Sequence, residues 1–384
     1  MQLTNANAGK VSLLDWLGTF EEKYPKLSWL GLRSAWQELV LQNKCPLSVK
    51  FTEQRFVELG CNSKTHLAVL FGSPLSHSLS PALHNFFNLG TPSQFCLYLP
   101  TQVESESAFR QILQSWQALP VIGANVTSPF KECAFRYLLE HGHLSQEALA
   151  IQAVNTIYSL NGKMYGDNTD WSGWLASWRH YIKEELAGRQ VVVFGAGGAA
   201  RAIVYALIRA KVASITIVNS PRRGQKLVAD FNDWQQKHNS NQAFIPIQNC
   251  PAWLKSGEPG YVYIQATVLG SSAFPNSTPY NWSCSSALLK TNTCIFNNAD
   301  NNKAWTTPLA CDLIYNPAQT EFLRLAKKSG AKTMNGLGML ICQAYRARAK
   351  FFALQPSETE EERLLDSFSD IYSRHGGQAA LDLS

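Results

Sequence analysis

The chain has 384 residues, of which 45% are hydrophobic and 16% charged, and its formal net charge is +6. This length suits two domains, and the composition is typical of a globular protein and argues against wholesale disorder. The scattered Lys and Arg residues have few aromatic residues between them and do not indicate nucleic-acid binding. No apolar run approaches the ~20 residues of a membrane span, and the first ten residues lack a signal-peptide pattern, so we expect a cytoplasmic protein. The nine Cys residues are dispersed without a CxxC pair, which predicts reduced thiols and no metal site.

Residues 1–65 predict a small helical extension. Trp16, Leu17 and Phe20 share one helical face, and the same spacing returns around Trp36. These tryptophans are expected to pack on the main body, and the role of the extension is left open.

From Leu67 onward the pattern alternates between strand and helix, which predicts a mostly parallel sheet. The expected strands are 67–71, 94–99 and 121–126, and the expected helices are 81–89, a helix around Phe109, and 131–139. The Asn161-Gly162 pair predicts a hairpin that places Asn155 and Asp170 on or just beyond paired strands.

Two polar clusters occur where predicted strands end. Ser78 and Ser80 could bind one anion near a helix start, although Ser80 could equally be a helix cap. The second cluster provides Asn125, Thr127 and Lys131 as convergent hydrogen-bonding groups. A lone lysine is usually solvated, so the second cluster needs further context.

The run 190–210, QVVVFGAGGAARAIVYALIRA, predicts a strand, a tight turn and a helix. Gly195 permits the turn, Gly197 leaves room for a pyrophosphate, and Ala200 lets the helix lie close to the strand. Free amides at the helix start would face the phosphates. The alternative is an ordinary glycine turn, but this position between strand and helix favours a dinucleotide site.

The next predicted strand, 214–218, ends at Asn219-Ser220-Pro221-Arg222-Arg223, and no carboxylate occurs before Asp230. An acidic residue here would hold the ribose hydroxyls of NAD, whereas guanidinium groups suit the 2′-phosphate of NADP. NADP is therefore the expected cofactor. NAD stays possible, because both arginines could instead face solvent at a loop tip.

Several motifs occur in one order along residues 66–352, and with them the chain resembles shikimate dehydrogenases, which reduce 3-dehydroshikimate to shikimate with a nicotinamide cofactor. The motifs are FGSPLSHSLSPALHN from Phe71, GANVTSPFKE from Gly123, QAVNT from Gln152, GDNTDWSGW from Gly166, VFGAGGAARA from Val193, CDLIYNP from Cys311 and NGLGMLICQA from Asn335. The FGSPLSHS and NTDW variants look most like the dehydrogenase module of fungal multifunctional arom polypeptides.

Matching positions imply that Lys131 and Asp170 are the catalytic pair. Reduction of a ketone by hydride leaves an alkoxide that must be protonated, and an ammonium beside a carboxylate can protonate it without a metal. The substrate residues implied are Ser78 and Ser80 at the carboxylate, Thr127, Asn155, Asp170 and Gln343 at the ring hydroxyls, and Tyr315 nearby. The cofactor residues expected are Gly195, Ala196, Gly197, Gly198, Ala199, Asn219, Ser220, Arg222, Arg223, Thr267, Gly338 and Met339.

The cofactor half departs from the family pattern. The usual Asn-Arg-Thr after the second strand of that half is Asn219-Ser220-Pro221, and the usual Asn-Ala-Thr begins with Gln265. The Asn- and Gln-rich stretches 231–248 and 291–302 predict long surface loops.

The expected fold is α/β with two domains: a Rossmann-like doubly wound cofactor domain and an α/β substrate domain, preceded by the helical extension. The expected boundaries are 1–65 for the extension, 66–170 with 336–384 for the substrate-binding domain, and 171–335 for the NADP-binding domain.

The expected function is reversible NADPH-dependent reduction of 3-dehydroshikimate in chorismate and aromatic amino-acid biosynthesis. The alternatives are a quinate/shikimate dehydrogenase using NAD or NADP, and an inactive regulatory module, against which the intact Lys131 and Asp170 argue. A small-molecule substrate is expected, with no nucleic-acid or membrane partner, in a monomer or homodimer.

Overall fold

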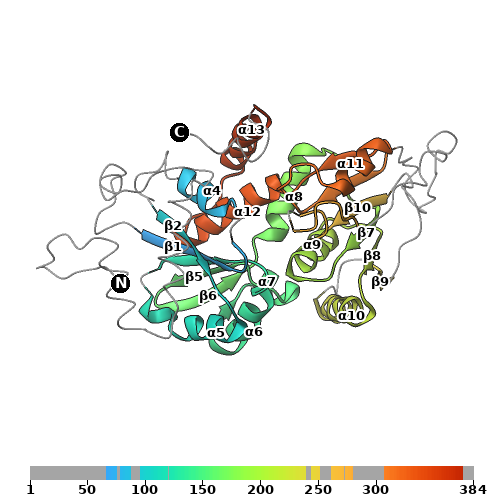
Figure 1. The fold of residues 1–384 in the computed structure, drawn as a ribbon. Coiled ribbons are helices and arrows are strands. Elements are labelled where there is room, and N and C mark those ends of the chain that lie inside the picture. Colours follow the sequence, from blue (N-terminus) through green and yellow to red (C-terminus); the bar gives the residue numbers. More distant parts are fainter. Residues whose placement is uncertain are drawn as a thin grey trace, which may run out of the picture.

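A computed structural model describes residues 66–75, 78–87, 96–119, 121–238, 244–250, 261–271, 273–279 and 307–374. The extension predicted for residues 1–65 and the loop predicted for 291–302 lie outside the described residues. Two six-stranded sheets form two halves, and helices α8 and α12 lie between them (Figure 1). Among the described helices, none combines the length and the apolar character needed to cross a bilayer.

The first sheet has the strand order β2-β1-β3-β5-β6-β4. Its strands are β1 (His66–Gly72), β2 (Cys96–Gln102), β3 (Gly123–Val126), β4 (His143–Leu144), β5 (Thr156–Leu160) and β6 (Lys163–Asp167). Strand β1 is parallel to β2 and β3, as predicted, but β5 runs antiparallel to β3 and β6. The hairpin prediction is confirmed: Leu160 pairs with Lys163 across Asn161 and Gly162, which have φ values of 51° and 73°. A two-residue turn can join only antiparallel strands, so the sheet is mixed.

The helices of this half cover the sheet with apolar side chains. They are α4 (Ser80–Phe86), α5 (Glu106–Gln114), the 3-10 helix η3 (Trp116–Ala118), α6 (Lys131–His141) and α7 (Gln146–Ile151). Phe109 and Leu113 are buried on α5, whose first turn is capped by Ser105 accepting from the amide of Ala108 at 3.1 Å. The predicted helix around Phe109 is thus confirmed, with Trp116 in the following 3-10 turn.

The second sheet is entirely parallel, with the order β12-β11-β10-β7-β8-β9. Its strands are β7 (Gln190–Phe194), β8 (Ser214–Val218), β9 (Ile247–Asn249), β10 (Tyr261–Gln265), β11 (Leu309–Asp312) and β12 (Lys332–Met334), and its helices are α9 (Gly198–Arg209), α10 (Pro221–His238) and α11 (Glu321–Lys328). This is the doubly wound order: strands are added in one direction from β7 to β9 and in the other from β10 to β12, so the order of addition reverses between β7 and β10. Ligands of such sheets bind at this reversal, beyond the carboxyl ends of the strands.

The prediction of a surface loop for residues 231–248 is wrong for residues 231–238, which the structure describes as helix. Helix α10 continues to His238, and Phe231 and Gln235 are buried on it. The Gln235 amide donates to the Ile245 carbonyl at 3.1 Å and accepts from the Ile245 amide at 2.9 Å. The polar composition was misleading because the buried Gln235 side chain pairs with the backbone N–H and C=O of Ile245 instead of facing solvent.

Helices α8 (Asp170–Tyr181) and α12 (Leu337–Phe351) pack closely against each other between the halves. A Cβ added to Gly173 on α8 would lie 2.7 Å from the backbone nitrogen of Gln343 on α12, so only glycine permits this approach. Helix α13 (Glu358–Arg374) is fastened to α12, because Glu361 accepts two hydrogen bonds of 2.7 Å from Arg346. The domain boundaries given above stay a prediction.

Candidate active site

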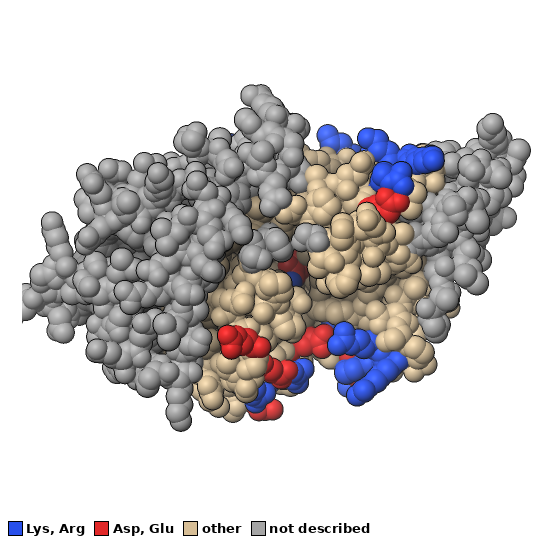
Figure 2. All heavy atoms as spheres, viewed as in Figure 1, with Lys and Arg blue, Asp and Glu red and all other residues tan. Residues whose placement is uncertain are grey.

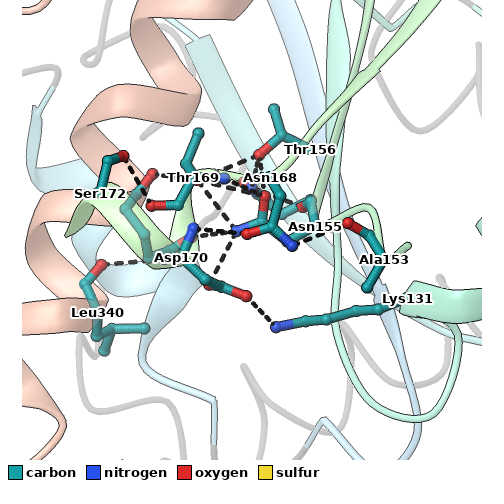
Figure 3. Close-up of polar contacts among 11 residues, drawn as sticks. Lys131, Ala153, Asn155, Thr156, Asn168, Thr169, Asp170, Ser172 and Leu340 are labelled. Carbon is teal, nitrogen blue, oxygen red and sulfur yellow. Dashed lines mark hydrogen bonds and ion pairs between the residues drawn. The ribbon is translucent and has the colours of Figure 1, made fainter. Parts of the chain in front are cut away.

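The first residues of two helices form a short ion pair. Lys131 begins α6 and Asp170 begins α8, and Lys131 Nζ lies 2.6 Å from Asp170 Oδ2 (Figure 3). The Lys131 side chain is 16% exposed and the Asp170 side chain 5%. The other oxygen of the carboxylate, Oδ1, accepts from Asn155 Nδ2 at 2.9 Å. A buried carboxylate needs such partners, and here both of its oxygens have one.

The Asn155 amide connects this pair to α12. Its Nδ2 also lies 3.0 Å from Thr169 Oγ1 and 3.3 Å from Gln343 Oε1. Its Oδ1 accepts from the Thr169 amide and from Thr156 Oγ1, both at 2.8 Å. The structure therefore brings together Asn155, Asp170 and Gln343, which the sequence places far apart.

Asn168 fixes the start of α8. Its Oδ1 accepts from the Asp170 amide at 3.0 Å, and its Nδ2 donates to the Ala153 carbonyl at 2.9 Å. Asp170 lies in the first turn of the helix, where the helix dipole favours a negative charge. Asn168 and Thr169 lie inside the GDNTDW motif, but no role was predicted for either residue.

Ser78, Ser80 and Tyr315 form a second group. Ser80 is buried at the start of α4, and its amide donates to Ser78 Oγ at 3.3 Å. The hydroxyl of Tyr315, which follows β11 in the other half, accepts from the Leu79 amide at 3.4 Å. Burial raises the pKa of Tyr315, and its hydrogen bonds to Leu79 and Ser78 oppose that shift.

Thr127 follows β3, and its methyl group packs on Gly72, where an added Cβ would lie 2.3 Å from Thr127 Cγ2. Within the described residues, neither Ser78 nor Ser80 hydrogen-bonds to Lys131 or Asp170. Hydrogen bonds thus join six of the predicted substrate residues in two groups, and among the described contacts Thr127 is bonded to neither.

The glycine turn between β7 and α9 has the shape that a dinucleotide needs. Gly195 has a φ of +117°, and a Cβ there would lie 2.9 Å from the Ala266 carbonyl oxygen, so the position requires glycine. Around Gly197 no atom lies within 4 Å of an added Cβ, which leaves the backbone open to a ligand. Helix α9 starts at Gly198 without a side-chain cap, so its first amides can face an anion. Ala196 lies in this turn, and Ala199 is the second residue of α9.

This turn contacts the segments that carry the ion pair. A Cβ on Gly198 would lie 3.1 Å from Lys131 Cβ and 3.4 Å from Ala153 Cβ. From the first turn of α9, Arg201 Nε donates to the Ile151 carbonyl, and Arg201 Nη1 lies 2.9 Å from Asp230 Oδ2. Arg201 was not among the predicted site residues, although a basic residue in the first turn of a largely apolar helix was the available signal.

The remaining predicted cofactor residues lie on three elements. Thr267 follows β10, and Gln265, which replaces the usual Asn, accepts from its amide at 3.0 Å and from its hydroxyl at 2.9 Å. Gly338 and Met339 lie in the first turn of α12, where a Cβ on Gly338 would be 2.4 Å from Ser177 Oγ on α8.

After β8, Ser220 Oγ donates to Asn219 Oδ1 at 3.2 Å. Arg222 and Arg223 are exposed in the first turn of α10, rather than at a loop tip. Figure 2 shows Lys and Arg side chains gathered over α10, and a hollow between the two halves with acidic and basic atoms at its floor.

Comparisons with known proteins agree with this arrangement. Residues 70–157 match the family model described as the shikimate dehydrogenase substrate binding domain. The shikimate dehydrogenase (NADP(+)) of Carboxydothermus hydrogenoformans is 34% identical over 298 residues, which cover 77% of this chain and 94% of that protein. The protein of the same name from Desulforamulus reducens is 34% identical over 288 residues, covering 74% of this chain and 89% of that one.

A solved structure with the same fold is that of shikimate 5-dehydrogenase from Thermus thermophilus in complex with NADP(H) and shikimate. It is 28% identical, with a TM-score of 0.60, and the match covers 79% of this chain and 99% of that chain. The Carboxydothermus and Desulforamulus proteins are 34% identical to this chain and are matched over 94% and 89% of their length. This chain therefore belongs to the shikimate dehydrogenase family.

Proposed function

We propose that this protein is an NADP-dependent shikimate dehydrogenase, which reversibly reduces 3-dehydroshikimate to shikimate in aromatic amino-acid biosynthesis. The observation that carries the proposal is the buried pair of Lys131 and Asp170 directly beside Gly198 of the glycine turn. A proton donor and a dinucleotide-binding turn in contact are what ketone reduction by a nicotinamide requires. The intact ion pair also argues against an inactive regulatory module.

The residues of the glycine turn fit a dinucleotide. The open backbone at Gly197 and the uncapped start of α9 provide space and amides for the pyrophosphate, at the reversal point of the sheet. NADPH, when bound, supplies the hydride. Thr267, Gly338 and Met339 are proposed to border the cofactor from β10 and α12.

Lys131 supplies the proton. Addition of hydride to the carbonyl carbon leaves a negative charge on oxygen, and Lys131 Nζ donates a proton to that oxygen to give the alcohol. Asp170 Oδ2 holds the ammonium at 2.6 Å, which orients it and stabilises its charge before transfer. In the oxidative direction the neutral amine of Lys131 accepts the proton from the substrate hydroxyl.

The substrate carboxylate is assigned to Ser78 and Ser80, with the Tyr315 hydroxyl beside them. The ring hydroxyls are assigned to Thr127, Asn155, Asp170 and Gln343. Asn155 and Gln343 support this assignment because both amides lie against the Asp170 carboxylate or its neighbours and are buried.

NADP is favoured over NAD by the charges around α10. Asp230 is the first carboxylate after β8, and it is paired with Arg201 at 2.9 Å and with Lys226 at 2.8 Å. The Asp230 carboxylate is thus occupied by these two ion pairs rather than available to bind ribose hydroxyls. Arg222 and Arg223 are exposed and can bind a phosphate. Replacing both arginines by Ala should raise the Michaelis constant for NADP+ and leave that for NAD+ nearly unchanged. An unchanged Michaelis constant for NADP+ would remove these arginines from the phosphate site.

Steady-state kinetics with shikimate and quinate, each with NADP+ and NAD+, test the proposal as a whole. We expect the highest kcat/KM for shikimate with NADP+. A higher value for quinate or for NAD+ would contradict it, and so would the absence of turnover with all four pairs. The cytoplasmic location and the choice between monomer and homodimer stay predictions.

A further inference from the structure

Asn125 is a buried amide that none of the roles above uses. It lies on β3, is 4% exposed, and is paired with Thr156 of β5 in the antiparallel register. Its Oδ1 accepts from the Tyr98 hydroxyl at 2.9 Å. Its Nδ2 donates to the Asn155 carbonyl at 3.1 Å and to Thr156 Oγ1 at 3.2 Å. One acceptor and two donor contacts are thus made by one planar group.

The contacts of Asn125 continue through Thr156 to the side-chain amide of Asn155. Thr156 Oγ1 accepts from Asn125 and donates to Asn155 Oδ1 at 2.8 Å. Asn155 Oδ1 also accepts from the Thr169 amide. Asn155 Nδ2 must then face the Asp170 carboxylate, at 2.9 Å. A flipped Asn155 amide would place its NH2 against the Thr169 N–H and its oxygen against a carboxylate oxygen, so both contacts would be repulsive.

We propose that Asn125 is a positioning residue that, through Thr156, fixes the orientation of the Asn155 amide and so holds the Asp170 carboxylate in place for Lys131. The proposal deepens the function proposed above and rests on it. Every hydrogen bond from Tyr98 to Asp170 donates in the same direction along this chain of side chains (Figure 3 shows its last links). Hydrogen bonds aligned in this way polarise and strengthen one another.

Tyr98, the first donor in this series of hydrogen bonds, is held in place by its neighbours. The Tyr98 ring stacks on His84 with centroids 3.9 Å apart and an interplanar angle of 3°, and both side chains are buried. The Tyr98 hydroxyl is therefore presented to Asn125 from a fixed position. Asn is the side chain that satisfies this site, because Asp of the same shape lacks the two donors and Leu lacks all three contacts.

The test uses near-isosteric replacements. Asn125→Leu and Thr156→Val each interrupt the chain, and each should lower kcat for shikimate oxidation about tenfold, with little change in the Kd for NADP+. The double variant should be no slower than the slower single variant, because both changes interrupt one route. Gln235→Leu is the matched control, since it removes a buried amide on α10 whose two hydrogen bonds go to the Ile245 backbone, and it should lower stability but leave kcat unchanged.

Crystal structures of the wild type and of Asn125→Leu give a readout that does not depend on activity. We expect the distance between Asn155 Nδ2 and Asp170 Oδ1 to exceed hydrogen-bonding range in the variant. If the wild type does not oxidise shikimate, the proposed function fails, and these two structures still decide the positioning role. An unchanged contact in the variant, kcat losses that multiply in the double variant, or an equal kcat loss in Gln235→Leu would each overturn the inference.

Discussion

Gly198→Ala should displace Lys131 without disturbing the fold. The added Cβ would lie 3.1 Å from Lys131 Cβ and 3.3 Å from Lys131 Cδ. Non-bonded carbon atoms normally lie at least about 3.5 Å apart, so the lysine stem must move by a few tenths of an ångström, about 0.4 Å. Gly198 begins α9 outside the left-handed region, so an Ala backbone is not strained there and stability should change little.

The displacement affects Lys131, the proposed proton donor. Misplacing a reacting group by ~1 Å can cost about 10²-fold in rate, so a shift of this size should lower kcat on the order of tenfold. Gly197→Ala is the matched control, because its added Cβ meets no atom within 4 Å but fills the open backbone of the turn. That variant should raise the Kd for NADP+ and leave kcat at saturation nearly intact.

Steady-state kinetics at saturating shikimate and NADP+ measure kcat for both variants, and isothermal titration measures NADP+ binding. The expected pattern is a loss of kcat in Gly198→Ala and a loss of NADP+ affinity in Gly197→Ala. A wild-type kcat in Gly198→Ala, or the same affinity loss in both variants, would refute the reasoning that the turn supports Lys131.

Lys131→Ala should lower kcat on the order of 10²-fold or more with a smaller effect on KM, Asp170→Asn should behave similarly, and near-normal turnover would contradict the mechanism. Ser78→Ala combined with Ser80→Ala should weaken shikimate binding by ~1–3 kcal/mol, and an equal loss of NADP+ affinity would mark the serines as structural. Burial raises the pKa of Asp312 from 3.8 to about 7, so the folded state binds more protons than the unfolded chain between these values. The wild-type free energy of unfolding should therefore fall as pH rises through this window. Asp312→Asn should reduce that fall in thermal unfolding at pH 5 and 8, and equal pH dependence in both proteins would disprove it.

The sequence predicted those elements whose signals are local. The order of strand, glycine turn and helix around Gly195 is set by neighbouring residues, and so is the hairpin at Asn161-Gly162. The resemblance to a known family added Lys131 and Asp170, which the structure places in contact. These predictions needed no knowledge of long-range packing.

The resemblance placed Asn155 and Gln343 at one substrate, but the hydrogen bonds that join residues far apart in the chain were not predicted. Asn155 Nδ2 contacts Gln343 Oε1 across 188 positions, and Arg201 contacts the Ile151 carbonyl across 50. No local pattern encodes which amide faces which carboxylate. The interpretation of α10 failed for a related reason, since the burial of Gln235 depends on the backbone of Ile245 arriving beside it.

Arg201 limits how the two halves could be exchanged between enzymes. The residue is 5% exposed, and its guanidinium joins the Ile151 carbonyl at the end of α7 to the Asp230 carboxylate on α10. A chimaera with a nucleotide-binding half lacking this arginine would leave that carbonyl without its cationic partner at the seam. Both contacts of Arg201 would be kept only if the end of α7 were exchanged together with α9 and α10. The unit of exchange is therefore larger than the parallel sheet and its helices.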